Sequence, residues 1–99
     1  MAGEVEQRRA PRAAIELECT LQRRSGSPIT CRTVDVGPGG MCVCSARPLA
    51  QDELLEFELP RVKGRARVLR QQGFDTYAVR FEDLEAAARD ELRRLAVSA

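Results

Sequence analysis

The chain has 99 residues, 43% of them hydrophobic, and a formal net charge of +1, which predicts one small domain with a single core. Of its 16 cationic residues all but Lys63 are arginine, which favours planar, bidentate recognition, and histidine and tryptophan are absent. Without an imidazole base and with one amine nucleophile, we expect the protein not to be an enzyme.

The N-terminal part predicts an arm followed by a β-hairpin. Residues 1–12 are polar and without periodicity, so we interpret them as a flexible arm, and residues 13–99 as one domain. Residues 15–22 alternate between hydrophobic and polar, which is typical of a strand with one buried face. After a turn, a second strand is expected at about 29–36, with Val34 and Val36 on one face and Asp35 on the other.

Four further strands are expected in the middle of the chain. A glycine-rich interruption at 37–40 precedes them, and three glycines in four residues indicate unusual torsions or close contacts. Alternating patterns then predict strands around 41–44, 54–59, 62–71 and 77–81.

The C-terminal segment changes to a helical period, and we predict a helix at about 84–96 with Asp83 as its N-cap. Its apolar stripe should cover one opening or face of the sheet, and comprises Leu84, Ala88, Leu92 and Leu95. The order of elements predicts a mainly β fold: a small closed antiparallel β-barrel or sandwich of five or six strands with a C-terminal α-helix.

Cys19, Cys31, Cys42 and Cys44 contain no C-x-x-C spacing, so we expect no metal site. Neither a signal peptide nor a membrane-spanning run is evident, which predicts a cytoplasmic protein with no membrane partner. We therefore favour reduced cysteines in the core. A disulfide between Cys19 and Cys31 across a hairpin is the alternative.

Two segments together indicate a function. Arg8 and Arg12 form an R-x-x-x-R motif before the first strand, and Asp35 stands five positions before Gly40 at the glycine-rich turn. With the strand at 77–81 and the helix after it, this arrangement resembles the PilZ domain, over about residues 6–96. The resemblance implies a six-stranded β-barrel with a C-terminal helix, and binding of the second messenger cyclic di-GMP without catalysis.

The resemblance also implies which residues bind. They are Arg8, Arg12, Asp35, Gly37 and Gly40, with Arg9 and Gly39 as additional candidates. Arginine can donate bidentately to guanine or stack on it, and an aspartate can accept from the N1–H and N2–H₂ groups of guanine. The glycines would let main-chain N–H groups approach a phosphate. No cofactor is implied beyond the ligand, and the expected partner is an unidentified effector protein.

This chain departs from the family pattern at Gly37, where the family has a serine that donates a hydrogen bond to the ligand. A degenerate adaptor that has lost nucleotide binding and acts only through protein contacts is therefore the alternative function. Gln7 replaces an arginine that accompanies binding of a stacked nucleotide dimer in the family, which favours one nucleotide per domain.

Simpler interpretations stand beside these hypotheses. R-x-x-x-R also occurs at Arg61/Arg65 and Arg89/Arg93, so the motif alone has no weight, and the arm could be a solvated basic tail. We interpret Arg65 and Arg67 as a solvated strand face rather than a second binding patch. A barrel that binds single-stranded nucleic acid would need a basic groove and stacking aromatic residues, which the charge of +1 and four aromatic residues argue against.

Overall fold

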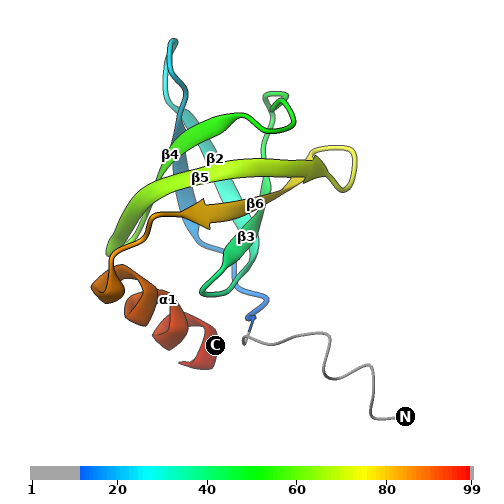
Figure 1. Cartoon of the computed structure of the whole chain (residues 1–99). Helices are drawn as coiled ribbons and strands as arrows, with labels where there is room; N and C mark the ends of the chain where they lie inside the picture. The colour runs from blue at the N-terminus through cyan, green and yellow to red at the C-terminus, as the bar shows by residue number, and fades with distance from the viewer. Residues whose placement is uncertain (1–11, 99) are drawn as a thin grey trace.

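Alternation of hydrophobic and polar residues produces six strands, and the computed structural model describes them within residues 12–98 (Figure 1). The described residues form the predicted mainly β fold with one C-terminal helix. The strands are β1 (Glu18–Gln22), β2 (Ile29–Val36), β3 (Gly40–Cys44), β4 (Leu54–Leu59), β5 (Val62–Gln71) and β6 (Thr76–Glu82).

All strand pairs are antiparallel, and the sheet closes on itself in the order β1-β2-β3-β6-β5-β4. The pairing of β1 with β4 completes the barrel and is short, since it joins three residue pairs from Thr20 to Gln22. Closure leaves no open sheet edge among the six strands. Strand β6 lies between β5, which precedes it in the chain, and β3, from which β4 and β5 separate it in sequence.

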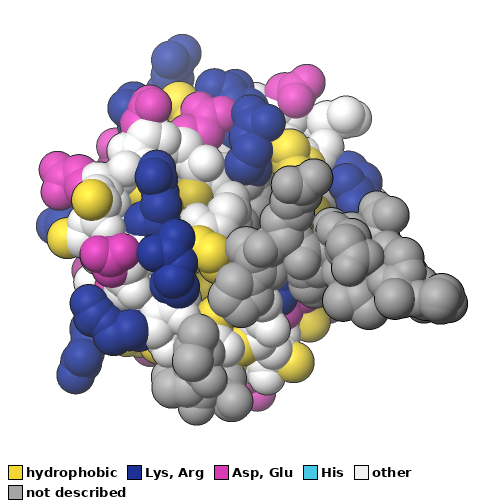
Figure 2. Space-filling model, turned by 60° about the horizontal axis from the view of Figure 1, so that its bottom comes forward, with side chains coloured by type: hydrophobic (Ala, Val, Ile, Leu, Met, Phe, Trp, Pro, Cys, Tyr) yellow, Lys and Arg dark blue, Asp and Glu magenta, His cyan; other side chains and the backbone are white. Residues whose placement is uncertain are grey.

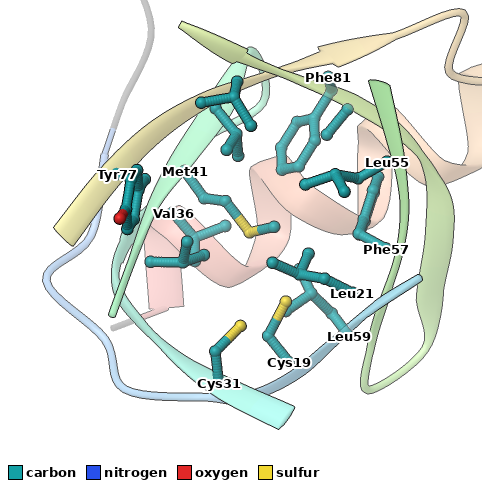
Figure 3. Packing of buried hydrophobic residues seen from close by; sticks show 14 of the residues in the cluster. Cys19, Leu21, Cys31, Val36, Met41, Leu55, Phe57, Leu59, Tyr77 and Phe81 are labelled. Atoms are coloured by element: carbon teal, nitrogen blue, oxygen red, sulfur yellow. The ribbon is translucent and has the colours of Figure 1, made fainter. Parts of the chain in front are cut away.

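Inward-facing residues of every strand meet in one core (Figure 3). The rings of Phe57 on β4 and Phe81 on β6 lie 4.7 Å apart between their centroids, and Leu21 and Met41 are almost fully buried beside them. Cys19 and Cys31 are also buried core residues, and the cysteines of the described chain carry free thiols, as favoured from the sequence.

Helix α1 (Ala86–Ser98) lies across one end of the barrel, as predicted (Figure 1). Leu92 is fully buried, and the rest of the predicted stripe packs against the same core. The predicted start was wrong: Asp83 adopts a left-handed backbone with φ of 54° and pairs with Arg65, and the Glu85 carbonyl accepts the first helical hydrogen bond. Within the described residues, no helix is long and apolar enough to cross a membrane.

Two expectations for the first hairpin are also corrected. Strand β1 begins at Glu18 rather than near residue 15, and Val34 is 45% exposed instead of sharing the buried face with Val36. The exposure of Val34 comes from a bulge in β2, where the register with β3 shifts between Thr33 and Asp35. One extra residue reverses the alternation of side chains, which a strictly period-two pattern cannot reveal.

Residues 13–17 run along β2 without joining the regular ladder. Ala13 and Val36 exchange two backbone hydrogen bonds of 2.9 Å. The buried Thr33 hydroxyl donates to the Ile15 carbonyl at 2.6 Å and accepts from the Leu17 amide at 2.8 Å. These contacts fix the segment that leads to Arg12.

Replacing Thr33 with valine should destabilise this attachment. Valine keeps the shape but leaves the Leu17 amide and the Ile15 carbonyl without their partner, at a cost of about 1–3 kcal/mol in the free energy of unfolding. Urea denaturation measures this loss. Thr30→Val is the matched control, because Thr30 is an exposed threonine on the same strand. Equal stability of the two variants would contradict the role given to the hydroxyl.

Candidate functional site

A surface pocket of about 510 Å³ lies over the outer faces of β3, β5 and β6, beside the turn that joins β2 to β3. It brings together segments from four distant parts of the sequence. Its lining comprises Arg12, Asp35, Gly37, Pro38, Gly39, Gly40, Met41, Leu69, Arg70, Gln72, Ala78, Val79 and Arg80. The predicted binding residues that the structure describes all line this pocket: Arg12, Asp35, Gly37, Gly39 and Gly40.

The Arg12 guanidinium and the Asp35 carboxylate form an ion pair at the pocket wall. Both side chains are about one-third exposed, so either can reach a bound molecule. The backbone bridge between Ala13 and Val36 favours this pairing, because it puts the side chains of residues 12 and 35 on the same face of the two segments, as diagonal neighbours. Arg8 and Arg9, the other predicted arginines, lie outside the described residues.

The glycine-rich turn forms a second wall, and its glycines have different roles. The Gly37 N–H donates to the Gly40 carbonyl at 2.9 Å, so this amide is used within the turn. That main-chain N–H groups of the glycines approach a phosphate stays a prediction. A Cβ on Gly40 would lie 2.3 Å from the Val79 carbonyl oxygen, whereas Gly39 has no atom within 4 Å of that position. Close approach of β3 and β6 thus requires glycine at position 40.

The floor of the pocket is small and apolar, and a β-bulge shapes it. Ala78 on β6 is half-buried, and opposite it the register of β5 shifts between Val68 and Arg70. Leu69 is the extra residue, and both Leu69 and Arg70 line the pocket. Bulges commonly redirect side chains beside binding sites. Here the bulge brings a hydrophobic surface and a guanidinium to the same place.

Arginine dominates the charge of the pocket. Arg80 pairs with Glu82 at 3.2 Å, and Glu82 also pairs with Arg67 at 2.7 Å. Hydrogen bonds from Arg67 and then Arg80 lower the pKa of the Glu82 carboxyl, which keeps it ionised. Arg70 has no acidic partner within ion-pair distance among residues 12–98. The pocket therefore holds a guanidinium that no carboxylate of the described residues neutralises.

Sequence reasoning missed Leu69, Arg70, Ala78 and Arg80 as residues of this pocket. Their strands were predicted correctly, but nothing in the alternation shows that β6 lies next to β3 and brings β5 to the same pocket. The break in alternation at 69–70 was the available indication, because it marks the bulge.

Outside this pocket, the arginines of the sheet are mostly occupied by acids. Arg65 pairs with Asp83 at 3.1 Å and Arg67 pairs with Glu82. These two arginines line a groove of about 860 Å³, which Asp52, Glu53 and Glu56 also line. At the helix end of the molecule, basic and acidic side chains are interspersed (Figure 2). In the part of the chain that the structure describes, no three potential ligand residues come together to hold a metal ion.

Comparison with known proteins identifies the fold. The family model of the PilZ domain matches residues 6–98. The PilZ domain of Escherichia coli YcgR, solved with c-di-GMP, is similar with a TM-score of 0.76 at 18% identity, covering 93% of this chain and 90% of that one. The PilZ domain of CeSA from a cellulose-synthesizing bacterium has a TM-score of 0.65 at 18% identity, covering 88% and 95%.

A further similar structure is longer. The Bacillus subtilis inhibitor of motility MotI/DgrA gives a TM-score of 0.79 at 15% identity, covering 92% of this chain and 50% of that one. The chain thus spans about half the length of that protein. No curated protein matches the sequence.

Gly40→Ala should destabilise the barrel, because the new methyl group meets the Val79 carbonyl and forces β3 and β6 apart. We expect a loss of about 1–3 kcal/mol in the free energy of unfolding, as for other overpacked positions. Gly39→Ala, one residue earlier, should change it by no more than about 0.5 kcal/mol. Thermal and urea unfolding of both variants measure this difference, and equal losses would show that the close approach at Gly40 is not the constraint.

Proposed function

Because the chain belongs to the PilZ domain family, we propose that it is a non-enzymatic receptor for cyclic di-GMP. The ligand would lie in the pocket over β3, β5 and β6 and signal through contact with another protein. The observation that carries this proposal is the pairing of Arg12 with Asp35 beside the glycine-rich turn. This pairing joins the two halves of the sequence motif in one pocket.

The chemistry of the pocket suits a ligand with two phosphates and two guanines. Three guanidinium groups, those of Arg12, Arg70 and Arg80, line it against the carboxylate of Asp35, and they favour a dianion. Asp35 would accept hydrogen bonds from the N1–H and N2–H₂ groups of one guanine. Ligand binding would break no ion pair of Arg70, which has no acidic partner among the described residues. Arg70 would donate to a phosphate or stack on a base over Leu69 and Ala78.

Arg12 has two roles in this proposal. In the free protein it holds the Asp35 carboxylate at the pocket wall. When ligand arrives, the carboxylate would share its oxygens between Arg12 and a guanine, and Arg8 and Arg9 would add contacts from the N-terminal arm. The arm would then lie against the barrel, and this altered surface is what an effector protein would recognise.

The alternative function, an adaptor without nucleotide, is favoured by one observation. Position 37 is glycine, so the hydroxyl that the family's serine supplies is missing, and the Gly37 amide is used within the turn. A lost hydrogen bond to a charged group costs about 1.5–3 kcal/mol, or roughly 10- to 100-fold in affinity. The remaining arginines and Asp35 are the reason to prefer the receptor.

The arginines of the pocket should dominate binding. Arg8→Ala, Arg12→Ala and Arg70→Ala should each weaken cyclic di-GMP binding by roughly 10- to 100-fold, because each removes a charge-assisted hydrogen bond. Calorimetric titration measures this, with GMP and cyclic di-AMP as ligand controls. Arg61→Ala and Arg89→Ala repeat the same spacing outside the pocket and should be near neutral.

Equal losses at all five arginines would indicate charge attraction alone and overturn the specific site. Absence of heat from the unsubstituted protein at high micromolar ligand would favour the adaptor.

Gly37→Ser should tighten binding by roughly 10-fold, since it restores the missing donor. Among the described glycines only Gly26 has positive φ, so the backbone at position 37 accepts a side chain without left-handed strain. Affinity and thermal stability are measured together. Unchanged stability with no detectable nucleotide binding would rule out the receptor in favour of the adaptor, and lower stability without tighter binding would assign Gly37 a backbone role.

A further inference from the structure

Two of the four cysteines lie opposite each other inside the barrel. Cys19 on β1 and Cys31 on β2 are directly paired in the antiparallel ladder, with 0% and 4% of their surfaces exposed. Both sulfur atoms turn into the interior as neighbours (Figure 3). They line none of the pockets described above and have no part in the proposed nucleotide site.

The ladder position suits a disulfide. Directly opposed residues on antiparallel strands have Cα atoms about 4.5–5.5 Å apart, within the range of about 4.4–6.8 Å found for disulfides. Cys42 and Cys44 are two residues apart on β3, so their Cα atoms are about 6.5 Å apart, near the upper end of this range. Their side chains run parallel, which keeps the Cβ atoms farther apart than the about 3.5–4.5 Å that a disulfide needs. Of these two pairs, only Cys19 and Cys31 can close without backbone movement.

The thiols of the interior pair are chemically unequal. The interaction between the two thiols raises the pKa of Cys19, together with burial, and lowers the pKa of Cys31. Burial raises the pKa of Cys42, and a hydrogen bond with Asp75 raises the pKa of Cys44. Because the thiolate is the nucleophile, the sulfur that ionises first attacks an oxidant, and its partner across the ladder is positioned to resolve the product.

An oxidant can reach the two cysteines at the shortest strand pairing of the barrel, the seam between β1 and β4. Strand β1 pairs with β4 through three residues, and this pairing ends at Thr20, next to Cys19. The other strand pairs each join four to six residue pairs. Local opening of a short seam requires less free energy than opening of a long one, so a small oxidant reaches this end of the pair first.

We propose that Cys19 and Cys31 are a modification site that a hydroperoxide converts into an intramolecular, reversible disulfide. The thiolate of one cysteine attacks the peroxide, the O–O bond breaks, and the leaving alkoxide takes the thiol proton and departs as an alcohol, or as water from hydrogen peroxide. The second cysteine then attacks the sulfenic sulfur of the first, and its proton leaves with the hydroxyl as water. The two thiols lose two electrons, the peroxide gains them, and a dithiol reductant reverses the change.

Hydrogen peroxide treatment followed by peptide mapping tests this inference. Trypsin cleaves after arginine and therefore releases the cysteines in three peptides. Cys19 lies in peptide 13–23, Cys31 in peptide 25–32, and Cys42 and Cys44 together in peptide 33–61. After alkylation of the remaining thiols under denaturing conditions, we expect peptides 13–23 and 25–32 joined and peptide 33–61 alkylated at both cysteines. Dithiothreitol should reverse the link.

Two variants keep the result decisive. The double variant Cys42→Ala, Cys44→Ala retains the interior pair. On peroxide treatment its mass should fall by that of two hydrogen atoms, at the same rate as the mass of the unsubstituted protein. Cys19→Ala should instead leave a sulfenic acid at Cys31 that dimedone captures. Links to peptide 33–61, irreversible oxidation of Cys31 without a link, or four alkylated cysteines after treatment would each overturn the proposal. If Cys19→Ala fails to fold, the double variant decides alone.

Discussion

The backbone bridge between Ala13 and Val36 is the contact on which the candidate site depends. This bridge attaches the start of the irregular segment 13–17 to β2, and the Thr33 hydroxyl attaches the same segment through two further hydrogen bonds. Next to this attachment, the Arg12 side chain pairs with Asp35, which precedes Val36 in β2. A motif whose halves are more than twenty residues apart is thus brought together by main-chain geometry and one buried threonine.

Two β-bulges then shape the pocket from opposite sides. The bulge in β2 turns Val34 outward and precedes the site residue Asp35, and the bulge in β5 adds Leu69 beside Arg70. Both interrupt regular strands where the barrel borders the glycine-rich turn. Because bulges bend a strand and increase its twist, the same features that curve the barrel also position the side chains of the site.

The sequence predicted the fold well because most strands have one face in the core. Alternation located β4, β5 and β6 closely, and the stripe of α1 located the helix to within two residues at each end. The pattern failed where a local conformation replaced it, at the β2 bulge and at Asp83, whose left-handed backbone ends β6. These are tertiary or single-residue effects with no period to detect.

The site was predictable only in part, for a related reason. Arg12, Asp35 and the glycines of the turn were found because they belong to a motif with fixed spacing. Arg70 and Arg80 were not, because their place in the pocket depends on which strands become neighbours when the barrel closes. Pairing across the barrel is a property of the whole sheet, so one strand's pattern cannot reveal it.

Hydrogen exchange with and without cyclic di-GMP tests the central claim most directly, that the N-terminal arginines and the glycine-rich turn form one site. The account predicts that ligand protects amides of residues 8–12 and of residues 37–40 together, with the same dependence on ligand concentration. Amides of α1, which lies outside the pocket lining, should be unchanged. Protection of only one of the two segments, or two different midpoints, would contradict a shared site.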